Sequence, residues 1–292
     1  MQELQGKAAI VTGAGRGLGR AFGLALAGAG AKVVVNDIDA AEAEAVAREI
    51  RAAGGTAAVN GDDVGDWTAA RRIAEQCAGE FGGIDVVVNN AGFTRVKPIW
   101  EEDEAGFEQL VRANLKGTFA VTRHALDHMR PRKSGSIINL CSGAQAGVAP
   151  RSVYAATKGG IASATYTRAV ELAEHGIRVN ALSPVAETRM AYKPLPPGAN
   201  IPPHRRPENI APLVVYLASD EARWITGQVF RLDGNTLSLF GHPRPLHLTP
   251  DARSWTLPVL HERLRAEFAA KLEPVGAGAR EYLYGGGAPK PA

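Results

Sequence analysis

Two side chains suited to proton transfer lie close together in a segment of helical composition. Tyr154 and Lys158 are four residues apart, and in a helix this spacing places both side chains on one face. A tyrosine hydroxyl, with a reference pKa of about 10, is a poor base at neutral pH, but a nearby ammonium group stabilises its ionised form. The pair therefore predicts an acid–base site in which Tyr154 moves a proton and Lys158 tunes it.

Two further polar residues are candidates for the same site. Ser142 directly follows an apolar run with the composition of a strand, so its hydroxyl can hold a reacting oxygen at the strand end. Asn114 lies inside a long helical segment, where a buried amide needs a reason, such as ordering a water molecule next to Lys158. Taken singly, Ser142 is also explained as a strand-end cap and Asn114 as an ordinary helix residue. Only their combination with a nucleotide-binding turn favours catalysis.

A glycine-rich turn near the N-terminus indicates where a dinucleotide binds. Gly13, Gly17 and Gly19 lie between a β-branched run and a segment of helical composition. Glycines let the backbone turn tightly and approach a pyrophosphate, while the helix N-terminus offers free N–H groups to the anion. We therefore expect this turn, with Arg16 and Leu18 inside it, to bind the cofactor.

The second predicted strand ends at a carboxylate that bears on the choice of cofactor. Asp37 lies roughly 20 residues after the glycine turn. At this spacing an acidic side chain can accept a hydrogen bond from the 2′-hydroxyl of an adenosine ribose. That arrangement favours NAD, because a 2′-phosphate would be repelled. Arg16 supports NADP by the opposite argument, but an arginine in the turn can point to solvent. We predict NAD, with NADP as the weaker alternative.

Two more strand ends carry residues that can contact the cofactor. Asp63 and Val64 follow the third predicted strand, and Asn90, Ala91 and Gly92 follow the fourth. In an open α/β sheet, ligands bind outside the carboxyl ends of the strands. We therefore expect an adenine contact at the first pair and a cofactor wall at the second group, although Asp, Asn and Gly are also common turn residues.

The elements that must position these residues alternate regularly along the chain. Apolar β-branched runs separated by helical segments predict a parallel sheet with helices on both faces, because parallel neighbours need a crossover helix. The predicted fold is a single doubly wound, Rossmann-type α/β domain with a seven-stranded parallel sheet. The expected strands are residues 8–11, 32–35, 57–59, 85–88, 136–138, 178–179 and 228–230, and the expected helices are residues 18–29, 40–53, 67–81, 107–128, 154–175 and 209–218.

Two stretches break this rhythm. Residues 184–207 are rich in proline, which excludes a helix interior and a central strand, so we expect a loop. Beyond Phe240 the composition becomes irregular, with one plausible helix at residues 256–272 before a Gly/Pro-rich end. We therefore predict an NAD-binding dehydrogenase domain at residues 1–240 and a docked, partly helical C-terminal extension at residues 241–292.

Composition excludes several other classes of protein. The 33 Lys and Arg residues against 30 Asp and Glu give a net charge of +3, spread along the chain, so nucleic acid is not an expected partner. No apolar run approaches the roughly 20 residues that cross a bilayer. The two cysteines are far apart in the sequence and do not have the close spacing of a metal-binding or redox motif, and no other set of metal ligands is evident. We expect a reduced, cytoplasmic protein with no metal.

Together these residues resemble the classical short-chain dehydrogenase/reductase family over about residues 5–236. The resemblance implies that Tyr154 transfers the alcohol proton, while Lys158 binds the nicotinamide ribose. It also implies that Ser142 orients the substrate oxygen and that Asn114 supports a proton-relay water. The implied reaction is hydride transfer between a secondary alcohol and a nicotinamide. The implied assembly is a homotetramer or homodimer, in which the helices carrying Asn114 and Tyr154 pack between subunits.

The chain departs from the family after the sixth predicted strand. Where the family has Pro-Gly, this sequence has Pro184 followed by Val185, so the backbone beside the nicotinamide carboxamide is expected to differ, and Thr188 remains a candidate contact. The following loop carries basic residues that are either ligands for the phosphates of a CoA ester or a solvated surface. These residues are Arg189, Lys193, His204, Arg205 and Arg206.

A narrower resemblance concerns the substrate. Residues 18–21, 34–37 and 183–190 are similar to the hydroxyacyl-CoA dehydrogenase part of peroxisomal multifunctional enzymes. This favours a 3-hydroxyacyl thioester or a steroid-like secondary alcohol as the small-molecule substrate. A different class of function stays open, a non-catalytic dinucleotide-binding regulatory or scaffold protein on the same fold, against which the intact Ser142, Tyr154 and Lys158 argue.

Overall fold

An eight-stranded sheet forms the centre of the computed structural model, which describes residues 3–190, 200–245 and 255–272. The strands are β1 (Ala8–Thr12), β2 (Lys32–Asn36), β3 (Thr56–Asn60), β4 (Val86–Asn89), β5 (Gly135–Leu140), β6 (Ile177–Val185), β7 (Val229–Asp233) and β8 (Thr236–Leu239). Their order across the sheet is β3-β2-β1-β4-β5-β6-β7-β8. The order reverses between β1 and β4, and the carboxyl ends of these two strands border the crevice where such folds bind ligands.

The sheet confirms the predicted α/β fold and adds one strand to it. The first seven strands run parallel, and β8 pairs antiparallel to β7. All residues of β1 and β4 are buried, whereas all four residues of β8 are exposed. A parallel strand covered by helices on both faces reads as a continuous apolar run, and an exposed edge strand does not. This explains why the sequence predicted seven strands and missed β8.

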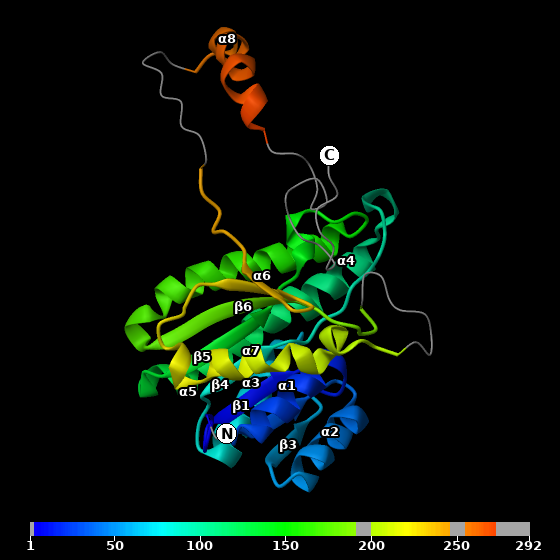
Figure 1. Ribbon diagram of the computed structural model, residues 1–292, viewed down its shortest axis with the longest axis vertical. Coiled ribbons are helices and arrows are strands. Elements are labelled where there is room, and N and C mark those ends of the chain that lie inside the picture. Colours follow the sequence, from blue (N-terminus) through cyan, green and yellow to red (C-terminus); the bar gives the residue numbers. More distant parts are fainter. Residues whose placement is uncertain (1–2, 191–199, 246–254, 273–292) are drawn as a thin grey trace.

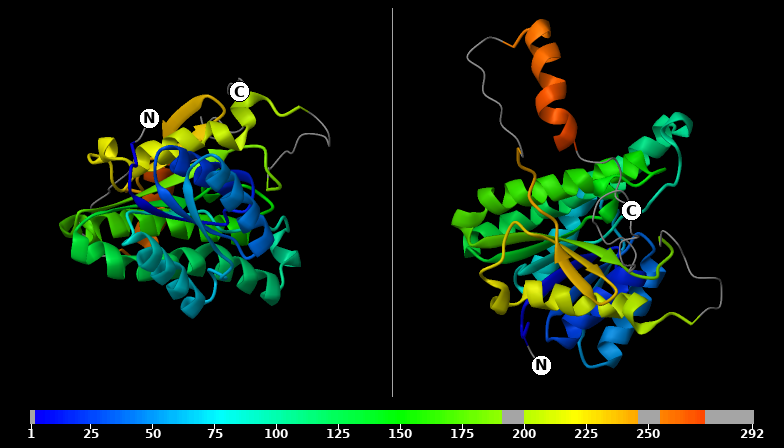
Figure 2. Two further views of the ribbon diagram at one scale, coloured as in Figure 1. Left: turned by 90° about the horizontal axis from the view of Figure 1, so that it is seen from below. Right: turned by 45° about the horizontal axis from the view of Figure 1, so that its top comes forward.

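Helices cover both faces of the sheet (Figure 1; Figure 2). One apolar cluster joins the strands to α1, α2 and α7, and a second joins them to α3, α5 and α6. The helices are α1 (Gly17–Gly28), α2 (Ala40–Ala52), α3 (Trp67–Phe81), α4 (Glu104–Leu110), α5 (Gly117–Arg132), α6 (Ser152–Glu171), α7 (Ala211–Ala218) and α8 (Leu257–Phe268). The doubly wound arrangement predicted from the alternation is therefore present.

The helix predicted at residues 107–128 has a different internal structure. It begins at Glu104, and a π-helical segment, Val111–Lys116, separates α4 from α5. A π-helical segment inside an α-helix is rare and is frequent at functional sites. Asn114 lies in this segment. Its position in a helix is as predicted, but the local widening of the helix was not.

The C-terminal extension contains the predicted helix. The described part is α8 followed by a short 3₁₀ turn, Ala269–Lys271. Figure 1 shows α8 apart from the layers around the sheet, and Val259 is the buried residue of this helix. The expected docking of the extension against the domain is thus not seen for α8. Among the described residues, no helix is long and apolar enough to cross a membrane.

Candidate active site

The glycine turn is closed against the end of β4. Gly13 and Gly17 have φ values of +60° and +53°, which glycine adopts without the cost that a Cβ imposes. A Cβ on Gly19 would lie 2.1 Å from the carbonyl oxygen of Gly13. The Asn90 Nδ2 donates to that same oxygen at 3.0 Å. The bare backbone at the N-terminus of α1 leaves room for a dinucleotide pyrophosphate.

Asp37 joins the glycine turn to the end of β2. Its side chain is 8% exposed, and its Oδ2 accepts from the backbone N–H of Gly15 at 2.9 Å. The Arg16 Nη2 lies 3.0 Å from Asp39 Oδ2. Two carboxylates thus lie beside the turn, and one of them binds the arginine that could have favoured a 2′-phosphate.

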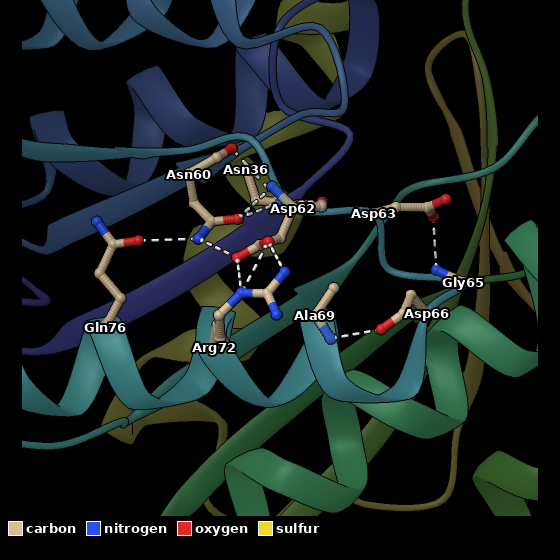
Figure 3. A network of polar contacts seen from close by, with 9 residues as sticks. All are labelled: Asn36, Asn60, Asp62, Asp63, Gly65, Asp66, Ala69, Arg72 and Gln76. Atoms are coloured by element: carbon tan, nitrogen blue, oxygen red, sulfur yellow. Dashed lines mark hydrogen bonds and ion pairs between the residues drawn. The ribbon is translucent and has the colours of Figure 1, made fainter.

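The candidate adenine contacts at the end of β3 adjoin a polar network. Figure 3 shows Asn60 between Asn36 and Gln76, and the donor–acceptor distances are 2.7 Å from Asn36 Nδ2 to Asn60 Oδ1 and 2.8 Å from Asn60 Nδ2 to Gln76 Oε1. Asp63 accepts from Gly65 N–H at 2.8 Å and lies 2.7 Å from Arg112. Val64 is buried. The end of β3 is therefore held rigidly by its own contacts.

Tyr154 and Lys158 are both buried on α6. The Lys158 Nζ lies 5.8 Å from the centre of the Tyr154 ring and donates to the carbonyl oxygen of Leu140 at 2.7 Å. Burial lowers the pKa of Lys158 from 10.5 to about 8, because the charged form loses hydration. The predicted pair is thus brought together, with a cation that titrates near neutral pH.

Ser142 extends the pair toward the end of β5. It caps a 3₁₀ turn, Gly143–Ala146, and its Oγ accepts from the N–H of Ala144 at 3.2 Å. This confirms the cap that the sequence suggested, and the hydroxyl retains a proton to donate. The neighbouring Cys141 is buried, and burial raises the pKa of its thiol to about 12. Cys141 therefore stays a neutral thiol beside Ser142.

Asn114 connects three segments around the site. Its Oδ1 accepts from Phe93 N–H at 2.9 Å, and its Nδ2 donates to the Phe93 carbonyl at 3.0 Å and to Thr157 Oγ at 3.2 Å. A Cβ on Gly92 would lie 2.7 Å from Asn114 Oδ1 and 3.8 Å from Lys158 Nζ. Gly92 therefore permits the close approach of these side chains, and Asn114 has one acceptor position left.

One cavity of about 600 Å³ brings together three of the four predicted catalytic residues and part of the predicted cofactor site. Of the predicted set, it is lined by Leu18, Asn90, Ser142, Tyr154, Lys158, Pro184 and Thr188. The other predicted residues lie outside this lining: Gly13, Arg16, Gly17, Gly19, Asp37, Asp63, Val64, Ala91, Gly92 and Asn114. The cavity thus runs from the start of α1 to the Tyr154 side chain.

The sequence missed several parts of the cavity wall. Among them are Leu140 and Cys141 at the end of β5, Arg151, and the β7–β8 turn from Asp233 to Thr236. Arg151 lies three residues before Tyr154, but it is the N-cap residue of α6 and has a non-helical backbone, so helical spacing in the sequence did not place it beside Tyr154. The turn carries no local signal, because its place at the cavity depends on how β7 pairs with β6.

Comparison with known proteins agrees with this geometry. The family model for short chain dehydrogenases matches residues 7–194. A 3-oxoacyl-[acyl-carrier-protein] reductase of Thermotoga maritima is 36% identical over 241 residues, covering 79% of this chain and 98% of the relative. The peroxisomal hydratase-dehydrogenase-epimerase of Saccharomyces cerevisiae is 37% identical over 233 residues, covering 76% of this chain and 25% of the relative.

A solved structure extends the similarity to three dimensions. The crystal structure of a short chain dehydrogenase from Mycobacterium avium has a TM-score of 0.85 and 37% sequence identity, and covers 93% of this chain and 97% of that one. Sequence and structure thus agree, and the narrower likeness to the peroxisomal enzymes is confirmed by the yeast relative. The chain belongs to the short-chain dehydrogenase family, whose members bind a nicotinamide dinucleotide and are oxidoreductases of hydroxyl and keto groups.

Proposed function

We propose that this chain is an NAD-dependent dehydrogenase that interconverts a secondary alcohol and its ketone. One observation carries the proposal: Ser142, Tyr154 and Lys158 line the same cavity as Leu18 at the glycine turn. A substrate oxygen in this cavity can meet the acid–base group while its carbon faces a bound nicotinamide. The family relationship supports the reaction class, and the side chains support the direction of proton movement.

Each side chain has a distinct role in the proposed oxidation. The Tyr154 hydroxyl, as its phenolate, takes the proton of the alcohol, and the Lys158 ammonium stabilises that phenolate. Ser142 donates a hydrogen bond to the substrate oxygen, and Asn114 uses its remaining acceptor position for a relay water beside Lys158. A bound NAD supplies the acceptor for the hydride that leaves the carbinol carbon. In the reverse direction Tyr154 returns the proton to the ketone oxygen.

The choice of NAD over NADP rests on charge at the end of β2. A 2′-phosphate would meet the carboxylates of Asp37 and Asp39, whereas a ribose hydroxyl can donate to Asp37. Arg16 is paired with Asp39 at 3.0 Å, which offsets its attraction for a phosphate. Asp63 and Val64 are the proposed adenine neighbours, and Pro184 and Thr188 are the proposed neighbours of the nicotinamide.

The relatives suggest the first compounds to test. One relative is named for 3-oxoacyl groups on an acyl carrier protein, so 3-hydroxyacyl thioesters come first and hydroxysteroids second. Arg205, one of the basic residues that are either CoA-phosphate ligands or a solvated surface, lies 2.7 Å from Glu187, and Lys193 lies outside the described residues. We further propose a cytoplasmic homotetramer or homodimer with residues 1–240 as its catalytic domain and residues 241–292 as an extension.

The test is NADH formation by the purified protein at mildly alkaline pH. NAD and NADP are compared with secondary alcohols of these classes, and Tyr154→Phe is the matched control. The variant lacks only the hydroxyl, so we expect kcat to fall about 10²–10⁴-fold, with NAD binding by calorimetry nearly unchanged. NAD binding without any turnover by the wild type would instead support the dinucleotide-binding regulatory or scaffold protein.

A further inference from the structure

One wall of the cavity is formed by two short segments that are distant in the sequence. The 3₁₀ turn Pro203–Arg205 contributes His204, and the β7–β8 turn contributes Gly234, Asn235 and Thr236. A Cβ on Gly234 would lie 3.4 Å from Cδ2 of the His204 ring. The imidazole therefore lies directly on the bare backbone of the β7–β8 turn, and the two segments form one continuous surface.

Asn209 joins these two segments from outside the cavity lining. Its Nδ2 donates to the carbonyl oxygen of Gly234 at 2.7 Å and to that of His204 at 3.4 Å. The amide nitrogen carries two hydrogens, so one side chain can serve both carbonyl oxygens. The next residue, Ile210, is fully buried in the apolar cluster with α1 and α7. Asn209 is therefore anchored to the core while it holds the wall.

The β7–β8 turn is followed by a strand that contributes little to its position. All four residues of β8 are exposed, so burial of this strand does little to fix the turn that precedes it. On the other side of the wall, Glu187 N–H donates to the Arg205 carbonyl oxygen at 2.6 Å, which ties the 3₁₀ turn to the segment after β6. The hydrogen bond from Asn209 to Gly234 thus determines how closely the two sides of the wall approach.

This wall lies at a distance from the reacting group. Ser142 follows β5 and the wall follows β7, and β6 lies between these two strands in the sheet. Two strand spacings correspond to roughly 10 Å. A substrate whose hydroxyl is held by Ser142 and Tyr154 therefore meets the wall only with the part of the molecule that extends beyond the carbinol carbon.

We propose that Asn209 is a positioning residue for substrate selection: by holding His204 against the β7–β8 turn, it sets the width of the cavity beyond the reacting carbon. This inference rests on the proposed function and narrows its substrate class. His204, Asn235 and Thr236 have side chains that donate and accept hydrogen bonds. The class that fits is an alcohol with a neutral carbonyl group beyond the carbinol carbon, as in a 3-hydroxyacyl thioester.

The test compares two alcohols that share one end. 2-Butanol and the N-acetylcysteamine thioester of 3-hydroxybutyrate carry the same methyl and carbinol groups, but only the thioester is long enough to reach the wall. Asn209→Asp keeps the shape of the side chain and replaces its N–H donors by an oxygen that repels both carbonyl groups. We expect the KM of the thioester to rise at least about 10-fold relative to that of 2-butanol, since a fitted pocket discriminates a single methylene by about 10–200-fold. The ratio of the two kcat values should change less, and Asn209→Gln, which keeps the amide donors, should restore the KM ratio in part.

The control is Gln228→Glu, which exchanges an amide for a carboxylate at the other end of β7. Gln228 Nε2 donates to the backbone carbonyl of Thr226 at 3.0 Å, and the residue lies outside the cavity lining, so the KM ratio should stay at the wild-type value. An unchanged ratio in folded Asn209→Asp overturns the proposal. So does an equal rise of both KM values, which would mean a structural role. If Asn209→Asp does not fold, Asn209→Ala gives the same comparison without an added charge.

Amide hydrogen exchange of the cofactor-free protein separates this inference from the proposed function. Losing the hydrogen bond of Asn209 should speed exchange in peptides that contain the β7–β8 turn about fivefold, the effect of one hydrogen bond, whereas peptides from α7 should exchange as in the wild type. Unchanged exchange of the turn overturns the positioning role, even where both alcohols are oxidised. Faster exchange in a protein whose wild type oxidises neither alcohol would support the hold of Asn209 on the wall and contradict the dehydrogenase function.

Discussion

The carboxyl ends of the strands form the ligand-binding edge of the sheet, and the two ends of this edge stabilise their buried polar groups in different ways. The nucleotide end is the side of β2 and β3, and the catalytic end is the side of Lys158 and Tyr154. At the nucleotide end, Asn36, Asn60 and Gln76 donate to and accept from one another (Figure 3). At the catalytic end, the Lys158 ammonium is buried and, within the described part of the chain, donates to the carbonyl oxygen of Leu140 at 2.7 Å. The first arrangement satisfies its polar groups locally. The second leaves a charge with little compensation until a cofactor or substrate arrives.

This difference separates stability from function along one edge of the sheet. Removing a member of the nucleotide-end network leaves buried partners unsatisfied, which destabilises the fold. Removing the buried ammonium relieves a desolvation cost but takes away the group that tunes Tyr154. We therefore expect substitutions at the catalytic end to reduce activity without reducing stability, and substitutions in the network to do the reverse.

The largest expected effect follows from Lys158→Met, which keeps the volume and removes the charge. Activity should fall about 10²–10⁴-fold, the range for loss of acid–base assistance, because the Tyr154 phenolate loses its cation. Stability should not fall at neutral pH. Relief of the charge burial outweighs the lost hydrogen bond to Leu140, which contributes roughly 1 kcal/mol.

The pH dependence of unfolding tests whether burying the Lys158 charge destabilises the fold. Because the pKa of Lys158 is about 8 in the fold and 10.5 by its ordinary value, the unfolded chain holds this proton more tightly. The cost of burying the charge is therefore fully present below pH 8 and disappears as the pH rises toward 10.5. In urea unfolding of the cofactor-free proteins, the free energy of unfolding of the wild type should rise relative to that of Lys158→Met by roughly 1 kcal/mol per pH unit in this window. Parallel curves would contradict the buried charge.

The sequence predicts most of what depends on local spacing. The glycine turn, Asp37 and the Tyr154 and Lys158 pair lie within single strand–helix units, where residue spacing determines direction in space. The Asn60–Gln76 bond is different, because it depends on where α3 places Gln76 relative to the end of β3, 16 residues earlier in the chain. Arg151 lies at the loop–helix boundary, where the composition of residues 148–152 does not fix the N-cap. The exposed strand β8 offers no buried face to produce a pattern.

An intermediate effect is expected at Asp37, which belongs to the nucleotide end but meets the ligand directly. Asp37→Asn keeps an acceptor for Gly15 N–H, at 2.9 Å in the wild type, and removes the charge. We expect the preference for NAD over NADP, as a ratio of kcat/KM values, to fall about 10-fold, since a charged hydrogen bond contributes roughly 1.5–3 kcal/mol. The matched control is Asp66→Asn, because Asp66 caps α3 through Ala69 N–H at 2.7 Å. An unchanged ratio in Asp37→Asn would remove Asp37 from cofactor selection.

The smallest effect on activity and the clearest effect on stability should come from Asn60→Ala. The substitution deprives Asn36 Nδ2 of an acceptor at 2.7 Å and the Asp62 N–H of an acceptor at 2.9 Å. Leaving buried groups unsatisfied costs about 1–3 kcal/mol, which for a chain of this length lowers Tm by several degrees. Since the network touches neither the cavity nor Tyr154, kcat should change by less than about threefold.

Gln76→Ala, at the partly exposed end of the network, should lower the free energy of unfolding by less than Asn60→Ala does. The double variant should lose less stability than the sum of the two single variants, because Asn60 and Gln76 share a hydrogen bond. A large loss of kcat in folded Asn60→Ala would show that the two ends are coupled, and the separation of stability from catalysis along this edge would then be wrong.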